Sequence, residues 1–257
     1  MARHRAVQFD EHLTLVEHLD ELRTRLVVSI AMLLVASALC FWQNDLVLEI
    51  ANRPLPGDLV PITFGVTEPF MTTLTLSIYG GILLAMPVIL YQAYAYVLPA
   101  FSPKERRVIL PFLLMVPFLF IAGVVFAYFV VIPAATKFLL NFNAAEFNIE
   151  VRAREYYSFF ALTCISIGVL FQIPIGVLAV TRLGITTPEQ LARNRKYAIL
   201  VIAVVAMLLP GTDPVTMLIS MLPLVLLFEL SLGLARLFGR PPDEAAATRA
   251  AEEAEAH

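Results

Sequence analysis

The stretch Leu98-Pro-Ala-Phe-Ser-Pro-Lys-Glu-Arg-Arg107 is a short charged segment between two long apolar runs. Residues 70–103 contain no charged side chain, and neither do residues 108–136. Because charged side chains are costly in hydrocarbon, the segment must be a turn at a membrane surface. Its second half has the pattern of a helix start, with Ser102 as N-cap, Pro103 at the first helical position and Glu105 at the capping-box position. The stretch therefore predicts two membrane spans joined by a stiff turn.

The composition supports a membrane protein. A soluble domain carries roughly 25% charged residues, whereas this chain of 257 residues carries 15% and is 59% hydrophobic. Several uncharged runs exceed the ~20 apolar residues that cross a bilayer as a helix. The runs do not alternate between polar and apolar residues, as the strands of a membrane barrel would. The predicted fold class is therefore an all-α membrane protein.

Six membrane spans are predicted within one domain, residues 1–238, and the fifth span, at only roughly 20 Å long, is too short to cross the bilayer fully. Spans 5 and 6 would then form a shallow hairpin beside which the membrane thins. A capping box at Thr14-Leu-Val-Glu17 predicts an amphipathic helix, residues 14–25, that lies on the membrane and leads into the first span. Residues 239–257 are expected to form a disordered tail. The spans are expected at about residues 26–42, 71–97, 108–138, 156–181, 197–209 and 214–235.

The distribution of Lys and Arg predicts the orientation in the membrane. Of the eighteen basic residues, only Arg53, Lys137, Arg152 and Arg154 fall on the side opposite the N-terminus. Positive charge gathers on the cytoplasmic side of membrane proteins. Both termini are therefore expected in the cytoplasm. On the same side, Thr187-Pro-Glu-Gln190 predicts another capped helix start.

Two carboxylates on that side, Glu21 and Glu105, are candidate binding residues. Each also has a structural interpretation: Glu105 completes a capping box, and Glu21 pairs with Arg25 four residues along a helix. In the functional interpretation the two carboxylates bind a guanidinium through bidentate hydrogen bonds. The two interpretations are compatible, because a capped carboxylate is also pre-oriented.

Two polar residues are predicted inside spans. Glu229 is a functional candidate because ionisable groups are rare in membranes, or it pairs with Arg236 near the surface. Gln172 either bonds a carbonyl freed by Pro174 or contacts a partner helix.

Other function classes lack their residues in this sequence. No histidine lies in a predicted span, Cys40 and Cys164 fit buried small residues, and no catalytic, phosphate-binding or metal-binding motif is present. We therefore expect no enzyme activity, metal, cofactor or nucleic-acid partner. A proton-coupled secondary transporter for a small solute is the main alternative, since several spans are broken by proline. Such transporters place charged groups near the midplane, where this chain has few.

Five blocks of sequence, in order between residues 12 and 238, resemble the TatC family, the large subunit of the twin-arginine protein translocase. The blocks are His18-Leu-Asp-Glu-Leu-Arg-Thr-Arg-Leu26, Pro87-Val-Ile-Leu-Tyr-Gln92, the opening stretch 98–107, Phe126-Ala-Tyr-Phe-Val-Val131 and Gly184-Ile-Thr-Thr-Pro-Glu189.

The resemblance implies a concave bundle of six spans, in the bacterial or archaeal cytoplasmic membrane, that binds twin-arginine signal peptides of folded cargo. It implies export powered by the proton gradient, with TatA-like and TatB-like single-span partners and self-association in the complex. It assigns peptide binding to Glu21, Glu105, Leu22, Arg23, Arg25 and Tyr96.

The resemblance also marks positions away from that surface. It implies that Pro54 and Asp213, in external loops, are needed for function. In the fourth span, relatives often carry a glutamate facing the single-span partners, and this chain has Gln172. The resemblance thus predicts a partner-helix contact at Gln172 without a protonatable group.

Overall fold

The computed structural model describes residues 15–57, 59–98, 103–146, 149–182, 185–210 and 213–238, without the side chains of residues 15–17, 103–109 and 238. Several sequence predictions fall outside these described residues. They are the caps at Thr14 and Ser102, the side chain of Glu105, and the tail of residues 239–257.

The described part of the chain is almost entirely helical, which confirms the predicted all-α fold class. Its β pairing is limited to an isolated bridge between Ile62 and Arg152. The helical elements are α1 (Leu15–Trp42), α2 (Asn44–Asn52), α3 (Glu68–Val97), α4 (Pro103–Phe126), the π-helix η2 (Ala127–Val131), α5 (Ile132–Asn141), α6 (Ala153–Leu170), α7 (Ile173–Arg182), α8 (Pro188–Arg193), α9 (Arg195–Met207) and α10 (Pro214–Phe238).

Five helical stretches are long and apolar enough to cross a membrane: His18–Trp42, Glu68–Val97, Leu110–Asn141, Ala153–Arg182 and Pro214–Leu237. Helix α9 has 13 residues, which corresponds to roughly 20 Å, and it packs along α10. It overlaps the short fifth span predicted at residues 197–209, and it is not one of these five stretches. Helix α1 is continuous, so residues 15–25 extend the first span without a break.

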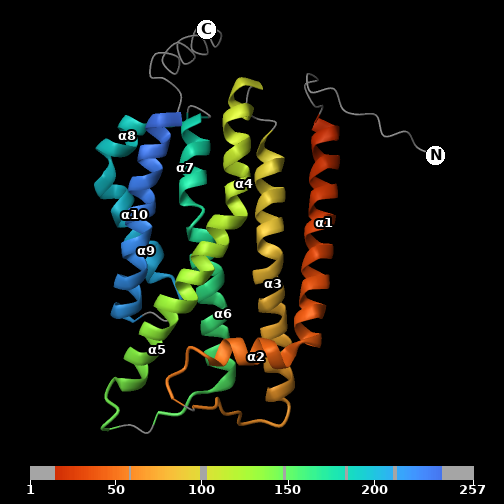
Figure 1. The fold of residues 1–257 in the computed structure, drawn as a ribbon, viewed down its shortest axis with the longest axis vertical. Coiled ribbons are helices and arrows are strands. Elements are labelled where there is room, and N and C mark those ends of the chain that lie inside the picture. Colours follow the sequence, from red (N-terminus) through yellow and green to blue (C-terminus); the bar gives the residue numbers. More distant parts are fainter. Residues whose placement is uncertain are drawn as a thin grey trace, which may run out of the picture.

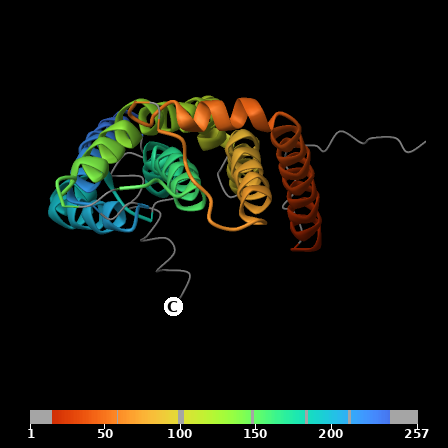
Figure 2. The same ribbon diagram turned by 90° about the horizontal axis from the view of Figure 1, so that it is seen from below.

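The helices stand side by side in a curved layer (Figures 1 and 2). In Figure 1 one edge of this layer, here called the upper edge, holds the start of α1, the end of α3, the start of α4 and helix α8. The opposite lower edge holds α2 and the starts of α3 and α6. Figure 2, which looks from the lower edge, shows the helices arranged in an arc and therefore a concave bundle.

Prolines determine where the long helices bend. Helix α4 contains Pro111 and Pro117, and it passes through η2 into α5, which has Pro133 near its start. Proline removes a backbone donor, and local π-turns absorb the resulting mismatch. The fourth span is broken at Phe171 and Gln172, immediately before the helical turn that contains Pro174. These bends let the continuous helical stretch from α4 to α5 pack against several neighbouring helices.

Small residues allow the closest helix contacts. A Cβ atom added to Gly81 in α3 would lie 2.6 Å from the Ser37 backbone in α1, and one added to Gly123 in α4 would lie 2.8 Å from Gly168 in α6. In a membrane, such backbone approach supplies the packing that drives helix association. Helix α1 packs mainly on α3, so its position depends strongly on Gly81.

We expect Gly81→Ala to destabilise the protein by about 1–3 kcal/mol, because overpacking must separate α1 from α3. Thermal unfolding in detergent, followed by circular dichroism, measures this change. Gly233→Ala in α10 is the matched control, since an added Cβ there meets no atom within 4 Å. Equal midpoints for the two variants would contradict the proposed contact.

Candidate functional site

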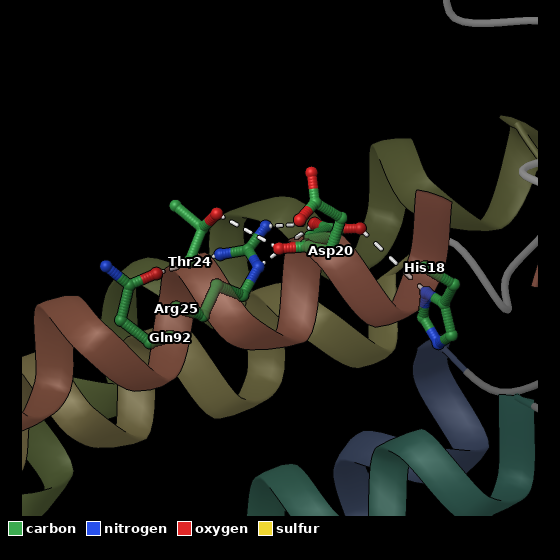
Figure 3. A network of polar contacts seen from close by, with 6 residues as sticks. His18, Asp20, Thr24, Arg25 and Gln92 are labelled. Atoms are coloured by element: carbon green, nitrogen blue, oxygen red, sulfur yellow. Dashed lines mark hydrogen bonds and ion pairs between the residues drawn. The ribbon is translucent and has the colours of Figure 1, made fainter. Parts of the chain in front are cut away.

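A polar cluster at the upper edge joins the first turns of α1 to the end of α3. The ring of His18 stacks on Tyr96, with centroids 4.3 Å apart and planes 11° from parallel. Arg25 donates through Nη1 to Oε1 of Gln92 at 2.8 Å (Figure 3). Both contacts link the predicted site segment in α1 to α3, so the packing of these two helices builds the cluster.

Glu21 lies at the centre of this cluster. Its Oε1 accepts hydrogen bonds from Nε of Arg25 at 3.0 Å and from Nη2 at 2.6 Å, which confirms the predicted pair at i and i+4. Its Oε2 lies 3.9 Å from Nδ1 of His18, beyond hydrogen-bond length. The Glu21 side chain is 26% exposed. Oε1 is therefore occupied by Arg25, whereas Oε2 forms no hydrogen bond with any described residue.

The predicted neighbours of Glu21 occupy different faces of α1. Leu22 and Arg23 are exposed, and Leu22 shares an apolar strip with Leu19 and Leu26. This strip continues down the helix at helical spacing. The polar cluster and an exposed apolar strip thus lie on the same short segment of helix.

The other predicted carboxylate belongs to α4. This helix begins at Pro103, so Glu105 lies in its first turn at the upper edge, the edge at which α1 also begins (Figure 1). The side chain of Glu105 is outside the described residues. The backbone therefore brings both predicted carboxylates to one edge of the bundle.

His18 and Gln92 were not predicted as site residues, although each belongs to a sequence block noted above. Their role depends on contacts between helices: Arg25 and Gln92 are 67 residues apart in sequence. No local spacing in α1 or α3 indicates which residues will meet. The available sequence signal was that each of these residues belongs to a block that resembles the TatC family.

Gln172 lies inside the bundle. Its side chain is buried, and Nε2 donates to the carbonyl oxygen of Val116 in α4 at 3.2 Å. This acceptor belongs to another helix, so the expected local bond to a carbonyl freed by Pro174 is not formed. Because the side chain is buried against α4, Gln172 could contact a partner helix directly only if its contact with α4 opened.

Glu229 pairs with a different arginine from the predicted one. Its Oε2 lies 3.1 Å from Nη2 of Arg195, at the start of α9. The predicted pairing with Arg236 was local to α10, whereas the observed ion pair joins two neighbouring helices. This ion pair links the start of α9 to the second half of α10.

The two predicted external-loop residues have structural contacts at the lower edge. Asp213 is buried and caps α10: its Oδ1 accepts from the Thr216 backbone N–H at 2.8 Å, and its Oδ2 accepts from the Thr216 hydroxyl. The Pro54 carbonyl accepts from the Thr136 hydroxyl at 3.4 Å. These bonds hold the turn before α10 and the loop after α2 in place.

Ion pairs at the lower edge hold further loops. Arg152 donates through Nε to Glu68 at 2.9 Å, and this hydrogen bond raises the pKa of Arg152. Arg53 donates to Glu49 at 2.8 Å, which raises the pKa of Arg53 in the same way. Both arginines therefore stay charged. Among the described residues, no group of three or more His, Cys, Asp or Glu side chains is arranged to hold a metal ion.

Comparison with known proteins supports the family resemblance over most of the chain. Residues 17–223 match the family described as "Sec-independent protein translocase protein (TatC)". The TatC of Carboxydothermus hydrogenoformans is 37% identical over 88% of this chain and 94% of its own length. The TatC of Escherichia coli is 34% identical over 87% of this chain and 88% of its own length.

The fold agrees as well. A crystal structure titled "Crystal Structure of Twin Arginine Translocase Receptor- TatC" superposes with a TM-score of 0.74 at 36% identity, over 87% of this chain and all of that one. With five long apolar helices in the described residues, the chain is a multi-pass membrane protein. The chain therefore belongs to the TatC family of Sec-independent protein translocase proteins.

Proposed function

We propose that this chain binds twin-arginine signal peptides at its upper edge and nucleates the complex that exports folded proteins with the proton gradient. As a TatC protein it is a component of a protein translocase and not an enzyme. The observation that carries the proposal is the polar cluster around Glu21, in which Arg25 holds Oε1 and Oε2 forms no hydrogen bond with any described residue.

The cluster suits the exchange of one guanidinium for another. Arg25 has two acceptors, Glu21 and Gln92, so it keeps a hydrogen bond when Glu21 turns to a guest arginine. The arginine of the signal peptide would bind Oε2 of Glu21 through charge-assisted hydrogen bonds, which are roughly twice as strong as neutral ones. In this mechanism Glu105 takes the second arginine of the pair.

The surroundings of the cluster suit the rest of a signal peptide. Leu19, Leu22 and Leu26 are 62%, 41% and 56% exposed, and they extend from the cluster toward the membrane. The apolar stretch that follows the arginines would pack along this strip. Arg23 and Tyr96 border the bound peptide, and Tyr96 keeps His18 in position.

The orientation follows from the basic residues, most of which the topology brings to the upper edge. We place this edge, with both termini, on the cytoplasmic side of a bacterial or archaeal cytoplasmic membrane. TatA-like and TatB-like single-span proteins would bind the concave face, where the short hairpin of α9 and α10 thins the bilayer. Gln172 would meet a partner only after the α4 contact opens.

We expect the isosteric change Glu21→Gln to weaken binding of a fluorescent twin-arginine signal peptide roughly tenfold to a hundredfold, because a charge-assisted bond contributes about 1.5–3 kcal/mol. Glu105→Gln should weaken binding to a similar degree. Fluorescence anisotropy with the detergent-solubilised full chain measures both effects. A twin-lysine peptide should bind weakly to every variant, since lysine lacks the bidentate fork.

The matched control for this measurement is Glu49→Gln. Glu49 and Arg53 form an ion pair with the same i, i+4 spacing at the lower edge. Glu49→Gln therefore tests the effect of removing a paired carboxylate that lies away from the site. Equal losses in Glu21→Gln and Glu49→Gln would contradict the assigned site. Solute uptake by the purified chain alone in liposomes would instead favour a secondary transporter.

The orientation makes a separate prediction. Asn194→Cys, at an exposed position of the upper edge, should react with a membrane-impermeant maleimide only after the cells are opened. Ala145→Cys, at an exposed position in the loop between α5 and α6 on the lower edge, should react in intact spheroplasts. The buried Cys40 and Cys164 provide the unreactive background. Reaction of Asn194→Cys in intact spheroplasts would reverse the assigned topology.

A further inference from the structure

A hollow at the lower edge is not used by the proposed peptide site. It has a volume of about 560 Å³ and is lined by Phe64, Glu68, Thr72, Arg152 and Arg154, among others. Its walls are the loop before α3, the first turns of α3 and the start of α6. A short parallel pairing holds these walls together: the Ile62 N–H donates to the Val151 carbonyl at 2.8 Å, and the Ala153 N–H donates to the Ile62 carbonyl at 2.9 Å.

The lining of this hollow has a net positive charge. The single carboxylate among its lining residues, Glu68, is already engaged: Oε2 accepts from the backbone N–H groups of Phe64 and Gly65, and Oε1 accepts from Arg152. Arg154 forms no ion pair with any residue in the described part of the chain. One lining cation is therefore compensated, and the other is left to attract an anion.

Hydroxyl groups lie beside that cation. Thr72 is 6% exposed, and its Oγ1 has no hydrogen-bond partner among the described residues. A smaller recess, lined also by Thr75 and Ser158, adjoins the hollow at Thr72 and Arg154. A buried hydroxyl without a partner is costly, so a ligand that accepts a hydrogen bond would favour rotation of the shielded Thr72 hydroxyl toward the hollow. Phosphate oxygens accept from both arginine and hydroxyl donors.

Apolar side chains border the hollow. Phe64 and Met71, which line it, are 72% and 55% exposed, and Val66 in the same loop is fully exposed. Trp42, at the end of α1 near this edge, is 82% exposed. Trp is enriched at membrane interfaces, and an exposed apolar patch beside it is typical of a surface that contacts lipid. The hollow thus opens at the level of the lipid headgroups, which points to a lipid rather than to a free anion.

We propose that this hollow binds the phosphate of an anionic phospholipid headgroup, with Arg154 as the charged donor and Thr72 as the buried hydroxyl donor. The acyl chains would lie against Phe64, Val66 and Met71. Binding would hold the loop of residues 59–67 and the start of α3 at the bilayer surface. The assignment of this lipid to the outer leaflet depends on the orientation proposed above. The rest of the proposal does not.

The test is titration of the full chain in a zwitterionic detergent with short-chain phosphatidylglycerol, followed by native mass spectrometry and thermal unfolding. Wild type should show saturable binding and a rise in unfolding midpoint. Arg154→Gln should weaken binding about tenfold or more, as expected for loss of a charged hydrogen bond. Thr72→Val, which keeps the side-chain shape, should weaken it roughly threefold because a neutral bond is lost.

Two comparisons show whether the effect belongs to this hollow. Lys137→Gln removes an exposed cation from the same side of the bundle but outside the hollow, so lipid binding should be unchanged. Equal weakening in Lys137→Gln and Arg154→Gln would overturn the proposal, as would lipid binding unaffected by Arg154→Gln. Equal binding of phosphatidylcholine, or full competition by inorganic phosphate at equal concentration, would also overturn it. Twin-arginine peptide binding should be unchanged in Arg154→Gln, which keeps this test separate from that of the peptide site.

Discussion

The whole structure depends on one constraint: in hydrocarbon, each backbone N–H and C=O group needs a partner within the protein. Helices meet this need internally, and at their breaks side chains form hydrogen bonds to neighbouring elements. At the break before α7, Gln172 joins the junction to the Val116 carbonyl of α4. At the π-helix η2, the Tyr128 hydroxyl donates to the Ile50 carbonyl of α2 at 3.0 Å. Each interruption thus becomes a connection between elements, and the bends together curve the bundle.

The two edges of the bundle are built differently. At the lower edge, Tyr156 donates to the Ala51 carbonyl at 2.6 Å and Tyr157 donates to Asn52 at 3.0 Å, so α2 is fixed on α6 by buried groups. Asp213 caps α10 in the same buried manner. At the upper edge, Glu21 and Arg25 are about a quarter exposed. Under the proposed function, the partner of Glu21 can exchange there, because water and the arginine of an incoming peptide compete with Arg25 for the same carboxylate acceptor. The peptide recognition that we propose therefore suits the upper edge, and the buried contacts anchor α2 and the start of α10 at the lower one.

Local patterns predicted local contacts well. The capping box at Thr187 is formed as expected: the Gln190 N–H donates to the Thr187 hydroxyl, and the Thr187 N–H donates to the Gln190 side chain, each at 3.2 Å. The pair of Glu21 and Arg25 is also present. Contacts between helices were predicted poorly. Glu229 pairs with Arg195 instead of Arg236, and Gln172 bonds to α4.

The amino-acid sequence by itself determined the fold class, the positions of the apolar helices, their prolines and the cap at Thr187. These features depend on residues within a few turns of one another, or on burial in lipid, and both leave a periodic or compositional pattern. Only the tertiary structure decided that Gln92 and Tyr96 contact the first turns of α1, and that Glu68 neutralises Arg152 while Arg154 forms no ion pair with any described residue. Such pairings join residues tens of positions apart. Helix packing selects them, and nothing in either segment alone specifies its partner.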